Sequence, residues 1–315
     1  MDISKSLNKK LGEGRVEKNK SLFPFFTLRV QTVAEYFVEV LTRDEFIGCV
    51  QFARKKNIPF TLIGGGSNMA PVADLLPGII MKNSYAKMNI IKEDDNNVEL
   101  LISSGYIMSL LVNKSIDMGW GGFEYHKGLP GTLGGAIHMN SKWTNPKSYA
   151  GDHLVDAVIL DTKGDMHTVD RSYFQFSHGF SILQKNHEVF LEGRFVLKKT
   201  DPSLLRARAD KALDHRMKTQ PIGVATSGCF FRNISEADKE RLGLPTTSSG
   251  YLIEKAGLKN LSVGSFKVSD IHANFIVNTG AGKANTKDLL QLVHMIKSKI
   301  RQQFELELRE EVVVI

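Results

Sequence analysis

The sequence is poor in cysteine and has no pattern of residues that would bind a metal ion. Its 315 residues include two cysteines, Cys49 and Cys229. Two are too few for the disulfide framework of a small secreted protein, and neither belongs to a CxxC pair of the kind found in zinc sites. His153 and His167 are isolated, and His272 has no second ligand at metal-binding spacing. We therefore expect reduced thiols and no metal site.

Long apolar runs are also missing. No segment reaches the roughly 18 consecutive apolar residues of a membrane-spanning helix. The N-terminal segment up to Lys20 has no apolar core of the length that a signal peptide needs. These absences predict a soluble, cytoplasmic protein without a membrane partner.

The charge balance is basic, but the pattern that marks nucleic-acid binding is absent. The formal net charge is +7, and lysines crowd the segment up to Lys20. There is no arginine-rich stripe with interleaved aromatic residues and no nucleic-acid-binding motif. A solvated basic tail and a pocket for phosphorylated ligands account for the charge. We therefore expect no nucleic-acid partner.

Helical and strand-type periods alternate along the chain and predict an α+β fold. Thr42 has the residue type of an N-cap, with Glu45 three residues later, and precedes an amphipathic run. Strand patterns dominate residues 85–200. The other expected helices lie at 203–219 and 288–304, and the other expected strands at 27–40, 59–64 and 305–315.

The pattern changes near residues 86 and 202, which we take as domain boundaries. The first residues are polar, with glycines at positions 12 and 14, and predict a flexible lead-in. The predicted division is a lead-in at 1–21 and three domains at 22–86, 87–202 and 203–315.

A glycine loop follows the apolar strand that ends near residue 64. The segment Leu62–Asn68 has the sequence LIGGGSN. Three successive glycines leave no Cβ between the backbone N–H groups and an incoming anion, so the loop can hold a pyrophosphate. It matches neither GxGxxG nor GxxxxGK[ST], so neither a dinucleotide-binding Rossmann unit nor an NTPase is indicated. A plain turn is the alternative, although a turn needs only one or two glycines.

A second glycine-rich segment, Gly128–Asn140, has the sequence GLPGTLGGAIHMN. Its glycines surround Pro130, whose ring fixes φ. Such a backbone can pass close to a flat ring or a phosphate, although a structural crossover would use the same residue types. Two glycine loops in one chain favour an extended cofactor.

These segments, taken in order, resemble the MurB family of bacterial UDP-N-acetylenolpyruvoylglucosamine reductases. GGGSN and GLPGTLGGAIHMN are followed by SGCFFRN, SGYLIEKAGLK, VSDIHANFIVN and LREEV, in the order and at the spacing of the family's motifs. The resemblance covers roughly residues 22–315, nearly the whole chain.

The resemblance implies a three-domain FAD-binding fold of the vanillyl-alcohol-oxidase and PCMH-like type, with a C-terminal substrate domain. Domains 22–86 and 87–202 would hold FAD, and 203–315 would bind the substrate. NADPH would reduce the flavin, which would pass hydride to UDP-N-acetylenolpyruvoylglucosamine and give UDP-N-acetylmuramate for peptidoglycan synthesis. No segment has room for the extra substrate-covering loop of the longer branch, so the chain resembles the loop-less, type II branch. We expect a monomer.

The resemblance places the binding residues in the glycine loops and in the third domain. Solvated or structural roles are the alternatives for the charged residues among them. The expected FAD contacts are Ile63, Gly64, Gly65, Gly66, Ser67, Asn68, Gly131, Thr132, Gly135 and Ala136, and the expected substrate contacts are Asn233, Arg216, Lys218, Gln220, Lys259 and His272.

Two residues match the family's catalytic positions. Cys229 stands where most of the family has a serine that protonates the substrate carbon; a thiol, with an ordinary pKa of about 8.5, is a competent acid. A buried, inert cysteine is the alternative. Glu311 matches the glutamate that orients and polarises the substrate carboxylate. Glu310 competes for that role, but neighbouring residues of a strand face opposite ways.

The chain departs from the family at two places. The family's third catalytic residue, an arginine, falls on Gly179, and His178 beside it could replace the arginine only if protonated. Two glycines near the flavin become Gln31 and Thr32. These departures leave two alternatives to an active reductase open: a flavin oxidoreductase with a different substrate, or a flavin- or UDP-sugar-binding relative that has lost catalysis.

Overall fold

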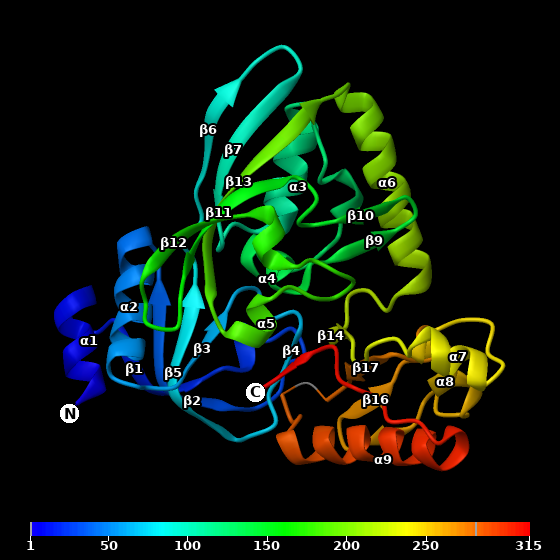
Figure 1. Ribbon diagram of the computed structural model, residues 1–315. Coiled ribbons are helices and arrows are strands. Elements are labelled where there is room, and N and C mark those ends of the chain that lie inside the picture. Colours follow the sequence, from blue (N-terminus) through cyan, green and yellow to red (C-terminus); the bar gives the residue numbers. More distant parts are fainter. Residues whose placement is uncertain (1, 281) are drawn as a thin grey trace. The chain divides into compact units, whose positions relative to one another are not determined.

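The computed structural model describes residues 2–280 and 282–315 (Figure 1). The chain divides into two compact units. The first contains the chain up to Lys18, Glu35–Gly65 and Pro77–Arg216, and the second contains Asn19–Ala34, Gly66–Leu76 and the chain from Met217 on. The chain therefore passes between the units within the first glycine loop, after Gly65.

The N-terminal segment is folded. Helix α1 (Ile3–Leu11) begins after Asp2, whose carboxylate accepts a hydrogen bond from the Lys5 N–H. Leu7 is fully buried, and α1 packs against α2 (Arg43–Lys55). The predicted flexible lead-in at 1–21 is therefore wrong for the residues that the structure describes. The apolar residues of α1 recur every four positions among polar residues and lysines. The mean hydropathy of the segment is therefore low, although one face of the helix is apolar.

The first sheet of the structure carries the glycine loop at the end of one strand. Its strands are ordered β1 (Val16–Ser21), β2 (Val33–Val40), β5 (Leu75–Asn83) and β3 (Phe60–Ile63). β3 runs parallel to β5 and pairs Ile63 with Lys82. As predicted, Thr42 caps α2, since its hydroxyl accepts a hydrogen bond from the Glu45 N–H at 3.2 Å.

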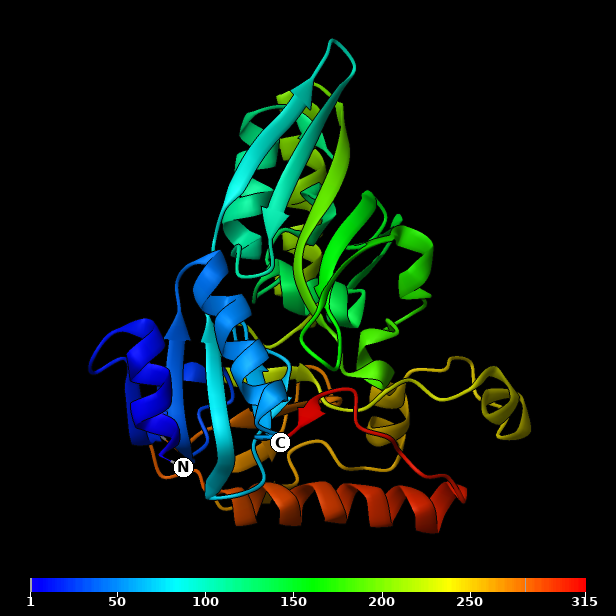
Figure 2. The ribbon, with the colours of Figure 1, turned by 60° about the vertical axis from the view of Figure 1, so that its left-hand side comes forward.

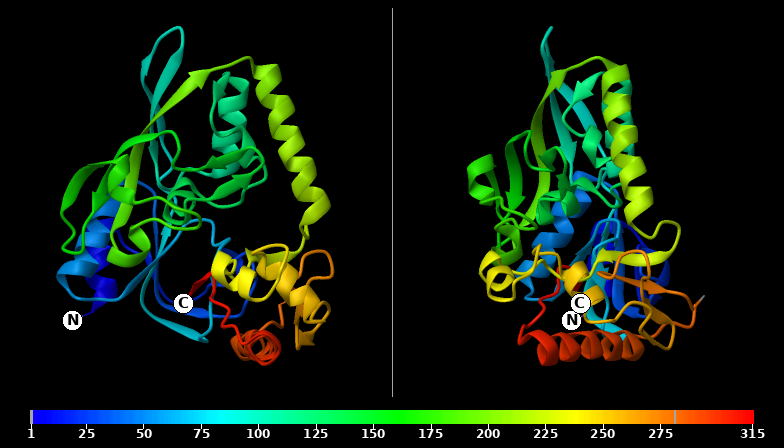
Figure 3. Two further views of the ribbon diagram at one scale, coloured as in Figure 1. Left: turned by 45° about the vertical axis from the view of Figure 1, so that its right-hand side comes forward. Right: turned by 90° about the vertical axis from the view of Figure 1, so that its right-hand side faces the viewer.

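A larger sheet forms the rest of the first unit. Its order is β12 (Met166–Asp170), β11 (Leu154–Leu160), β13 (Val189–Lys199), β7 (Asn97–Ser103) and β6 (Met88–Glu93), and β8 (Trp120–Gly121) pairs with the end of β13. Figure 2 shows β6 and β7 as a long hairpin. Figure 3 shows α6 (Pro202–Thr219) as a long helix beside α3 (Met108–Asp117). The remaining elements are η2 (Glu124–His126), α4 (Leu133–Met139), β9 (Lys142–Thr144), β10 (Lys147–Tyr149), η3 (Arg171–Phe174) and α5 (Leu183–Asn186).

The second unit is built on a smaller sheet, in the order β14 (Ala225–Cys229), β17 (Phe275–Asn278), β16 (Phe266–Val268) and β15 (Ser262–Val263). Helix α9 (Thr286–Phe304) packs against it through a buried stripe that includes Leu289, Leu292 and Ile296. The helix begins at Asn285, whose side chain accepts from the Asp288 N–H at 2.8 Å. The other elements are η1 (Phe23–Phe25), β4 (Met69–Ala70), α7 (Glu236–Arg241), α8 (Ser249–Lys255) and β18 (Val313–Val314), which is parallel to β4.

Two of the predicted strands are shorter than expected, whereas the helices predicted at 203–219 and 288–304 are confirmed by α6 and α9. The strand expected at 27–40 begins only at Val33, because Arg29 has φ +56° and interrupts the extended backbone. The strand expected at 305–315 is reduced to β18 and to an isolated bridge between Glu310 and Phe231. The domain boundaries near residues 86 and 202 stay a prediction.

Candidate active site

The first glycine loop leaves β3 and comes so close to other backbone that side chains do not fit. A Cβ on Gly65 would overlap the Cα of Gly131, and a Cβ on Gly66 would overlap the carbonyl oxygen of Phe25. Gly66 also has φ +63°, which glycine adopts at little cost. The N–H groups of Gly65 and Gly66 donate to no acceptor in the described part of the chain. Both donors are therefore available to an anion.

We predict that Gly65→Ala destabilises the protein by about 1–3 kcal/mol or more, because its methyl group would be forced into the backbone at Gly131. The purified Gly65→Ala protein should also contain less bound flavin than the wild type. Thermal unfolding of the flavin-free chain measures the first effect.

Gly135→Ala is the matched control for this prediction. A Cβ at Gly135 would have Thr132 Oγ1 as its nearest neighbour, at 3.8 Å. The change also gains helix propensity, up to about 1 kcal/mol. The flavin-free Gly135→Ala protein should unfold at or above the wild-type temperature. Equal losses in the two variants would contradict the steric argument.

The second glycine loop is fixed by the segment that leads into α3 and by the first residue of that helix. The Met108 N–H donates to the Gly131 carbonyl at 3.0 Å, and the Gly134 N–H donates to the Ser104 carbonyl at 2.8 Å. A Cβ on Gly134 would lie 2.8 Å from the Ser104 Cβ, so this contact also needs glycine. Thr132 stands at the N-cap of α4, but its hydroxyl caps no helix N–H. That hydroxyl can therefore serve a ligand.

Two residues at the end of β5 connect to both loops. Lys82 Nζ donates to the Gly64 carbonyl at 2.8 Å. Asn83 Nδ2 donates to Ser104 Oγ at 2.8 Å, and the carbonyl of Ser104 holds Gly134. Our sequence reasoning missed this pair; the available signal was two polar residues that end an otherwise apolar strand.

These features fit a dinucleotide cofactor such as FAD. The loops offer N–H donors without acceptors, an open position at Gly135 and the ammonium of Lys82. The predicted cofactor positions Ile63, Gly64, Gly65, Gly131, Thr132, Gly135 and Ala136 lie in the first unit, and Gly66, Ser67 and Asn68 lie in the second. Their individual contacts with FAD stay a prediction.

Within the second unit, the segments that carry Cys229 and Glu311 are hydrogen-bonded neighbours. The Glu311 N–H donates to the carbonyl of Phe230 at 2.8 Å. Asn274 fixes the same segment, because its Oδ1 accepts from the Phe231 N–H at 2.9 Å and its Nδ2 donates to the Phe231 carbonyl at 2.7 Å. Phe230, whose carbonyl accepts from Glu311, directly follows Cys229 in the sequence. The half-buried Cys229 is therefore adjacent to the residue that binds the backbone of Glu311.

The end of the first glycine loop joins this network. The Val313 N–H donates to the Asn68 carbonyl at 2.9 Å, and Asn68 Nδ2 donates to the Glu311 carbonyl at 3.4 Å. Thr27 donates from its N–H to the Gly66 carbonyl at 3.1 Å and from its hydroxyl to the Thr226 carbonyl, in β14, at 2.7 Å. The chain from Gly66 to Asn68 is therefore tied to the two segments that carry the predicted catalytic residues.

The structure distinguishes Glu311 from its neighbour. The carboxylate of Glu310 forms an ion pair with Lys297 of α9, at 2.9 Å. The carboxylate of Glu311 forms no ion pair with any residue that the structure describes. Burial raises the pKa of Glu311, and the charge of Arg232 opposes that rise. Glu310 is thus engaged in holding α9, whereas the Glu311 carboxyl remains available for a substrate.

The residues that depart from the family near the flavin contact other parts of the second unit. Gln31 Nε2 donates to the Gly282 carbonyl at 2.8 Å, and the hydroxyl of Thr32 donates to the Ala73 carbonyl at 2.6 Å. The contact with the glycine loop is made instead by Thr27, which the chain retains. The changes at 31 and 32 therefore leave the loop's own anchor in place.

Gly179 lies in a tight turn that is fixed to the C-terminal end of α4. Ser181 Oγ donates to the His138 carbonyl at 2.7 Å, and Gln184 Nε2 donates to the Gly179 carbonyl at 3.0 Å. Gly179 has φ +67°, and no atom lies within 4 Å of a Cβ placed on it. The position thus has room for a side chain but a backbone conformation that favours glycine.

His178, beside Gly179, is a poor substitute for an arginine. Partial burial lowers its pKa, and the charges of Lys142 and Lys147 lower it further. The imidazole is therefore neutral near pH 7. Positive charge near this turn comes from the two lysines of the β9–β10 hairpin and from Lys185, whose ammonium lies over the ring of Phe180 at 5.2 Å.

The predicted substrate residues near the end of α6 differ in exposure. Arg216 is buried, and its guanidinium lies over the ring of Trp143 at 4.9 Å. Lys218 is exposed and Gln220 is half-buried. Arg216 thus has a structural partner already, and the roles of all three in substrate binding stay predictions.

Of the remaining predicted substrate residues, Asn233 and His272 lie at the start of α8 and Lys259 lies beyond its end. Asn233 Oδ1 accepts from the Ser249 N–H at 3.3 Å, and Lys259 forms an ion pair with Glu254 at 2.7 Å. His272 packs against the ring of Phe275, and its Nδ1 accepts from the Asn274 N–H at 3.2 Å. His272 therefore contacts the residue that fixes the Cys229 segment. The roles of these residues in substrate binding stay predictions.

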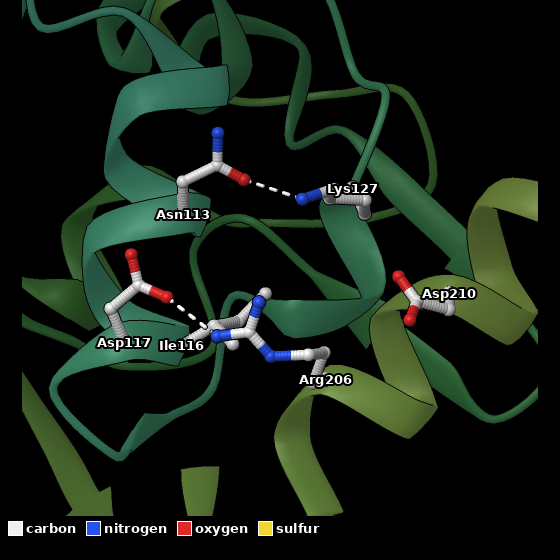
Figure 4. A pocket seen from close by; sticks show the side chains of 6 residues that line it. All are labelled: Asn113, Ile116, Asp117, Lys127, Arg206 and Asp210. Atoms are coloured by element: carbon white, nitrogen blue, oxygen red, sulfur yellow. Dashed lines mark hydrogen bonds and ion pairs between the residues drawn. The ribbon is translucent and has the colours of Figure 1, made fainter. Parts of the chain in front are cut away.

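A polar hollow between α3 and α6 lies away from these residues. Figure 4 shows its lining, in which Lys127 is hydrogen-bonded to Asn113 and Arg206 is paired with Asp117 at 2.8 Å. None of the predicted site residues lines it. We therefore do not assign it to the active site.

The described part of the chain contains neither a metal-binding cluster nor a helix that could span a membrane. Among residues 2–280 and 282–315, no group of three or more His, Cys, Asp and Glu side chains could hold a metal ion. Over the same residues, no helix is both long and apolar enough to span a membrane.

Comparisons with known proteins agree with this arrangement. Residues 34–170 match the FAD binding domain family, and residues 220–315 match the family described as UDP-N-acetylenolpyruvoylglucosamine reductase, C-terminal domain. The UDP-N-acetylenolpyruvoylglucosamine reductase of Acaryochloris marina is 30% identical over 96% of this chain and 93% of its own. That of Bacillus subtilis is 30% identical over 96% of this chain and 94% of its own.

A solved structure extends the likeness to three dimensions. The crystal structure of UDP-N-acetylenolpyruvylglucosamine reductase (MurB) from Thermus caldophilus matches with a TM-score of 0.77 and 26% identity, over 95% of this chain and 98% of the other. Together with the FAD binding domain, this match confirms the predicted α+β FAD-binding fold.

Proposed function

Because this chain belongs to the family of UDP-N-acetylenolpyruvoylglucosamine reductases, we propose that it reduces UDP-N-acetylenolpyruvoylglucosamine to UDP-N-acetylmuramate. FAD is the cofactor and NADPH the hydride donor. The observation that carries the proposal is the hydrogen bond from the Glu311 N–H to the Phe230 carbonyl, at 2.8 Å. It holds an available carboxyl group next to the segment of a half-buried thiol, which is the pair of groups that this reaction needs.

Bound FAD would supply the hydride-transfer chemistry that links NADPH to the enolpyruvyl double bond. Cys229 donates the proton that the adjacent carbon of the substrate requires, since its thiol is an acid of suitable strength. The cysteine must then regain a proton from solvent, which its partial exposure permits. The first glycine loop would hold the cofactor through the N–H groups of Gly65 and Gly66, which have no acceptor among the described residues.

Glu311 orients and polarises the carboxylate of the substrate. Two negative carboxylates repel each other, so an unprotonated Glu311 would oppose binding. The raised pKa of Glu311 favours the form that carries a proton and can donate it in a hydrogen bond to the substrate. We assign the grip on the UDP-sugar to Asn233, Arg216, Lys218, Gln220, Lys259 and His272.

We further propose that the protein acts as a cytoplasmic monomer in the synthesis of peptidoglycan precursors, as part of cell wall formation. The substrate and product are charged nucleotide sugars, which do not cross a membrane unaided. Sedimentation of the purified full chain and fractionation of the cells that produce it test these two statements.

Anaerobic stopped-flow measurement tests the proposed reaction. The FAD-loaded protein is reduced with NADPH and then mixed with UDP-N-acetylenolpyruvoylglucosamine, while the absorbance of oxidised flavin is followed. Rapid reoxidation with formation of UDP-N-acetylmuramate is the expected result. Reduction by NADPH without reoxidation by this sugar would indicate a different acceptor, and failure to bind FAD would favour a relative that has lost catalysis.

Gly179→Arg should keep or raise the activity, because the position is open and an arginine there restores a permanent cation near the turn. The left-handed φ of +67° should lower stability by about 1–3 kcal/mol. Gly179→Ala carries the same backbone strain without the charge and serves as the control. A large loss of turnover in the arginine variant alone would show that the site is built around the glycine.

A further inference from the structure

Lys82 places a cation beside the first glycine loop without a carboxylate to balance it. Its Nζ donates to the Gly64 carbonyl at 2.8 Å and to the Asn83 carbonyl at 3.3 Å. No carboxylate among the described residues lies within ion-pair distance of it. The carboxylate of Glu39 acts on it from further away, and that carboxylate accepts a hydrogen bond from Ser84.

Such an arrangement is unfavourable unless an anion completes it. The side chain of Lys82 is half-buried, and this burial lowers the pKa of the ammonium. Moving a charge out of water costs free energy that two neutral carbonyl groups recover only in part. An ammonium has three donors, and the carbonyls of Gly64 and Asn83 use two of them. One donor and an unbalanced positive charge remain.

The surroundings of Lys82 point to a phosphate as that anion. Its partner Gly64 belongs to the loop in which the N–H groups of Gly65 and Gly66 have no acceptor. A Cβ on Gly64 would meet the side chain of Thr132, so the second glycine loop borders the same place. Backbone donors and a nearby ammonium are the two components of known phosphate cradles.

We propose that Lys82 is a binding residue for the diphosphate of FAD, an inference that rests on the proposed function. Its ammonium keeps the Gly64 carbonyl occupied and adds positive charge where the diphosphate binds. A lysine that merely ties the loop to β5 is the competing explanation. The two differ in what salt and removal of the charge do to cofactor affinity.

The experiment compares Lys82→Met with the wild type and with Lys87→Met. Lys87 is exposed, its side chain has no partner among the described residues, and its loss removes the same formal charge. For each full-length chain, FAD is removed and its dissociation constant is measured by fluorescence titration at several salt concentrations. The thermal midpoint of the flavin-free chain is recorded alongside. Lys82→Arg tests whether a cation alone restores binding.

In Lys82→Met we expect FAD to bind about ten- to a hundredfold more weakly, as for loss of a charge-assisted hydrogen bond. The affinity should depend less steeply on salt than in the wild type. The flavin-free chain should unfold at an unchanged or higher temperature, because an unbalanced cation has been removed. Lys87→Met should match the wild type, and Lys82→Arg should recover part of the affinity.

Unchanged affinity, or weaker affinity with the wild-type dependence on salt, would overturn the inference. In the second case a lower unfolding temperature of the flavin-free chain would identify Lys82 as a structural tie. A wild-type chain that binds no FAD at all would instead refute the proposed function. The two failures are therefore distinguishable.

Discussion

Cys229→Ala is expected to leave reduction of the flavin by NADPH intact and to slow reduction of the enolpyruvyl sugar by about 10²–10⁴-fold, the usual contribution of a positioned proton donor. The side chain is small and half-buried, so its removal should disturb packing little. The two half-reactions are measured separately by anaerobic stopped flow. Cys229→Ser should retain part of the activity, since a hydroxyl can also donate a proton.

Cys49→Ala provides the matched control. Cys49 lies in α2, is 1% exposed, and burial raises its pKa to about 12. Its loss should lower the thermal midpoint through packing alone and leave both half-reactions unchanged per bound flavin. Wild-type sugar reduction in Cys229→Ala would remove Cys229 from the mechanism.

Glu311→Gln should have an effect of similar size on the sugar half-reaction. An amide keeps the shape of the carboxyl group but can neither share a proton with the substrate carboxylate nor follow its change of charge. Glu310→Gln is the control, because it removes the ion pair with Lys297 from the neighbouring residue. That variant should lose some stability but keep its turnover. The reverse ranking of the two variants would exchange the roles of the glutamates.

Glu311→Gln should also change the stability of the protein. It is expected to lower turnover but to raise stability at neutral pH. The folded protein raises the pKa of Glu311 above its unfolded value, mainly through burial. The unfolded chain therefore loses this proton at a lower pH than the folded chain does, and stability falls as the pH rises through that window. Glu311→Gln should unfold at a higher temperature than the wild type at neutral pH. The difference should vanish below the ordinary pKa range of glutamate, as calorimetry over a pH series will show.

Much of this arrangement follows from local patterns in the sequence. The N-cap at Thr42 and the apolar stripe of α9 depend on contacts within a few residues, and such contacts can be inferred from spacing alone. The first glycine loop was also predictable, because three successive glycines after an apolar strand are more than a plain turn needs and indicate close approach of a ligand or of other backbone. The resemblance to the reductase family then related the glycine loops to the later motifs that carry the predicted catalytic residues.

Other features depend on residues that are distant in the sequence. The ion pair of Glu310 with Lys297 separates two adjacent glutamates that no local pattern distinguishes. The role inferred for Lys82 depends on its hydrogen bond to the Gly64 carbonyl. The parallel pairing of β3 with β5 brings these two residues together. The lead-in was mispredicted for the same reason, since the apolar face of α1 becomes visible only when α2 is present to receive it.

The pairing of the first glycine loop with the end of the described chain has a consequence for the order of folding. Asn68 and Glu311 are 243 residues apart, and their contact closes a loop that contains most of the protein. Contacts over such separations form late, because the loss of chain entropy must first be offset by the elements between them. The contact of Glu311 with Phe230 spans a shorter separation, so a partly folded chain would hold the segments of Cys229 and Glu311 together before the glycine loop joins them. Catalytic competence should appear in the last kinetic phase of refolding, after most of the secondary structure has formed.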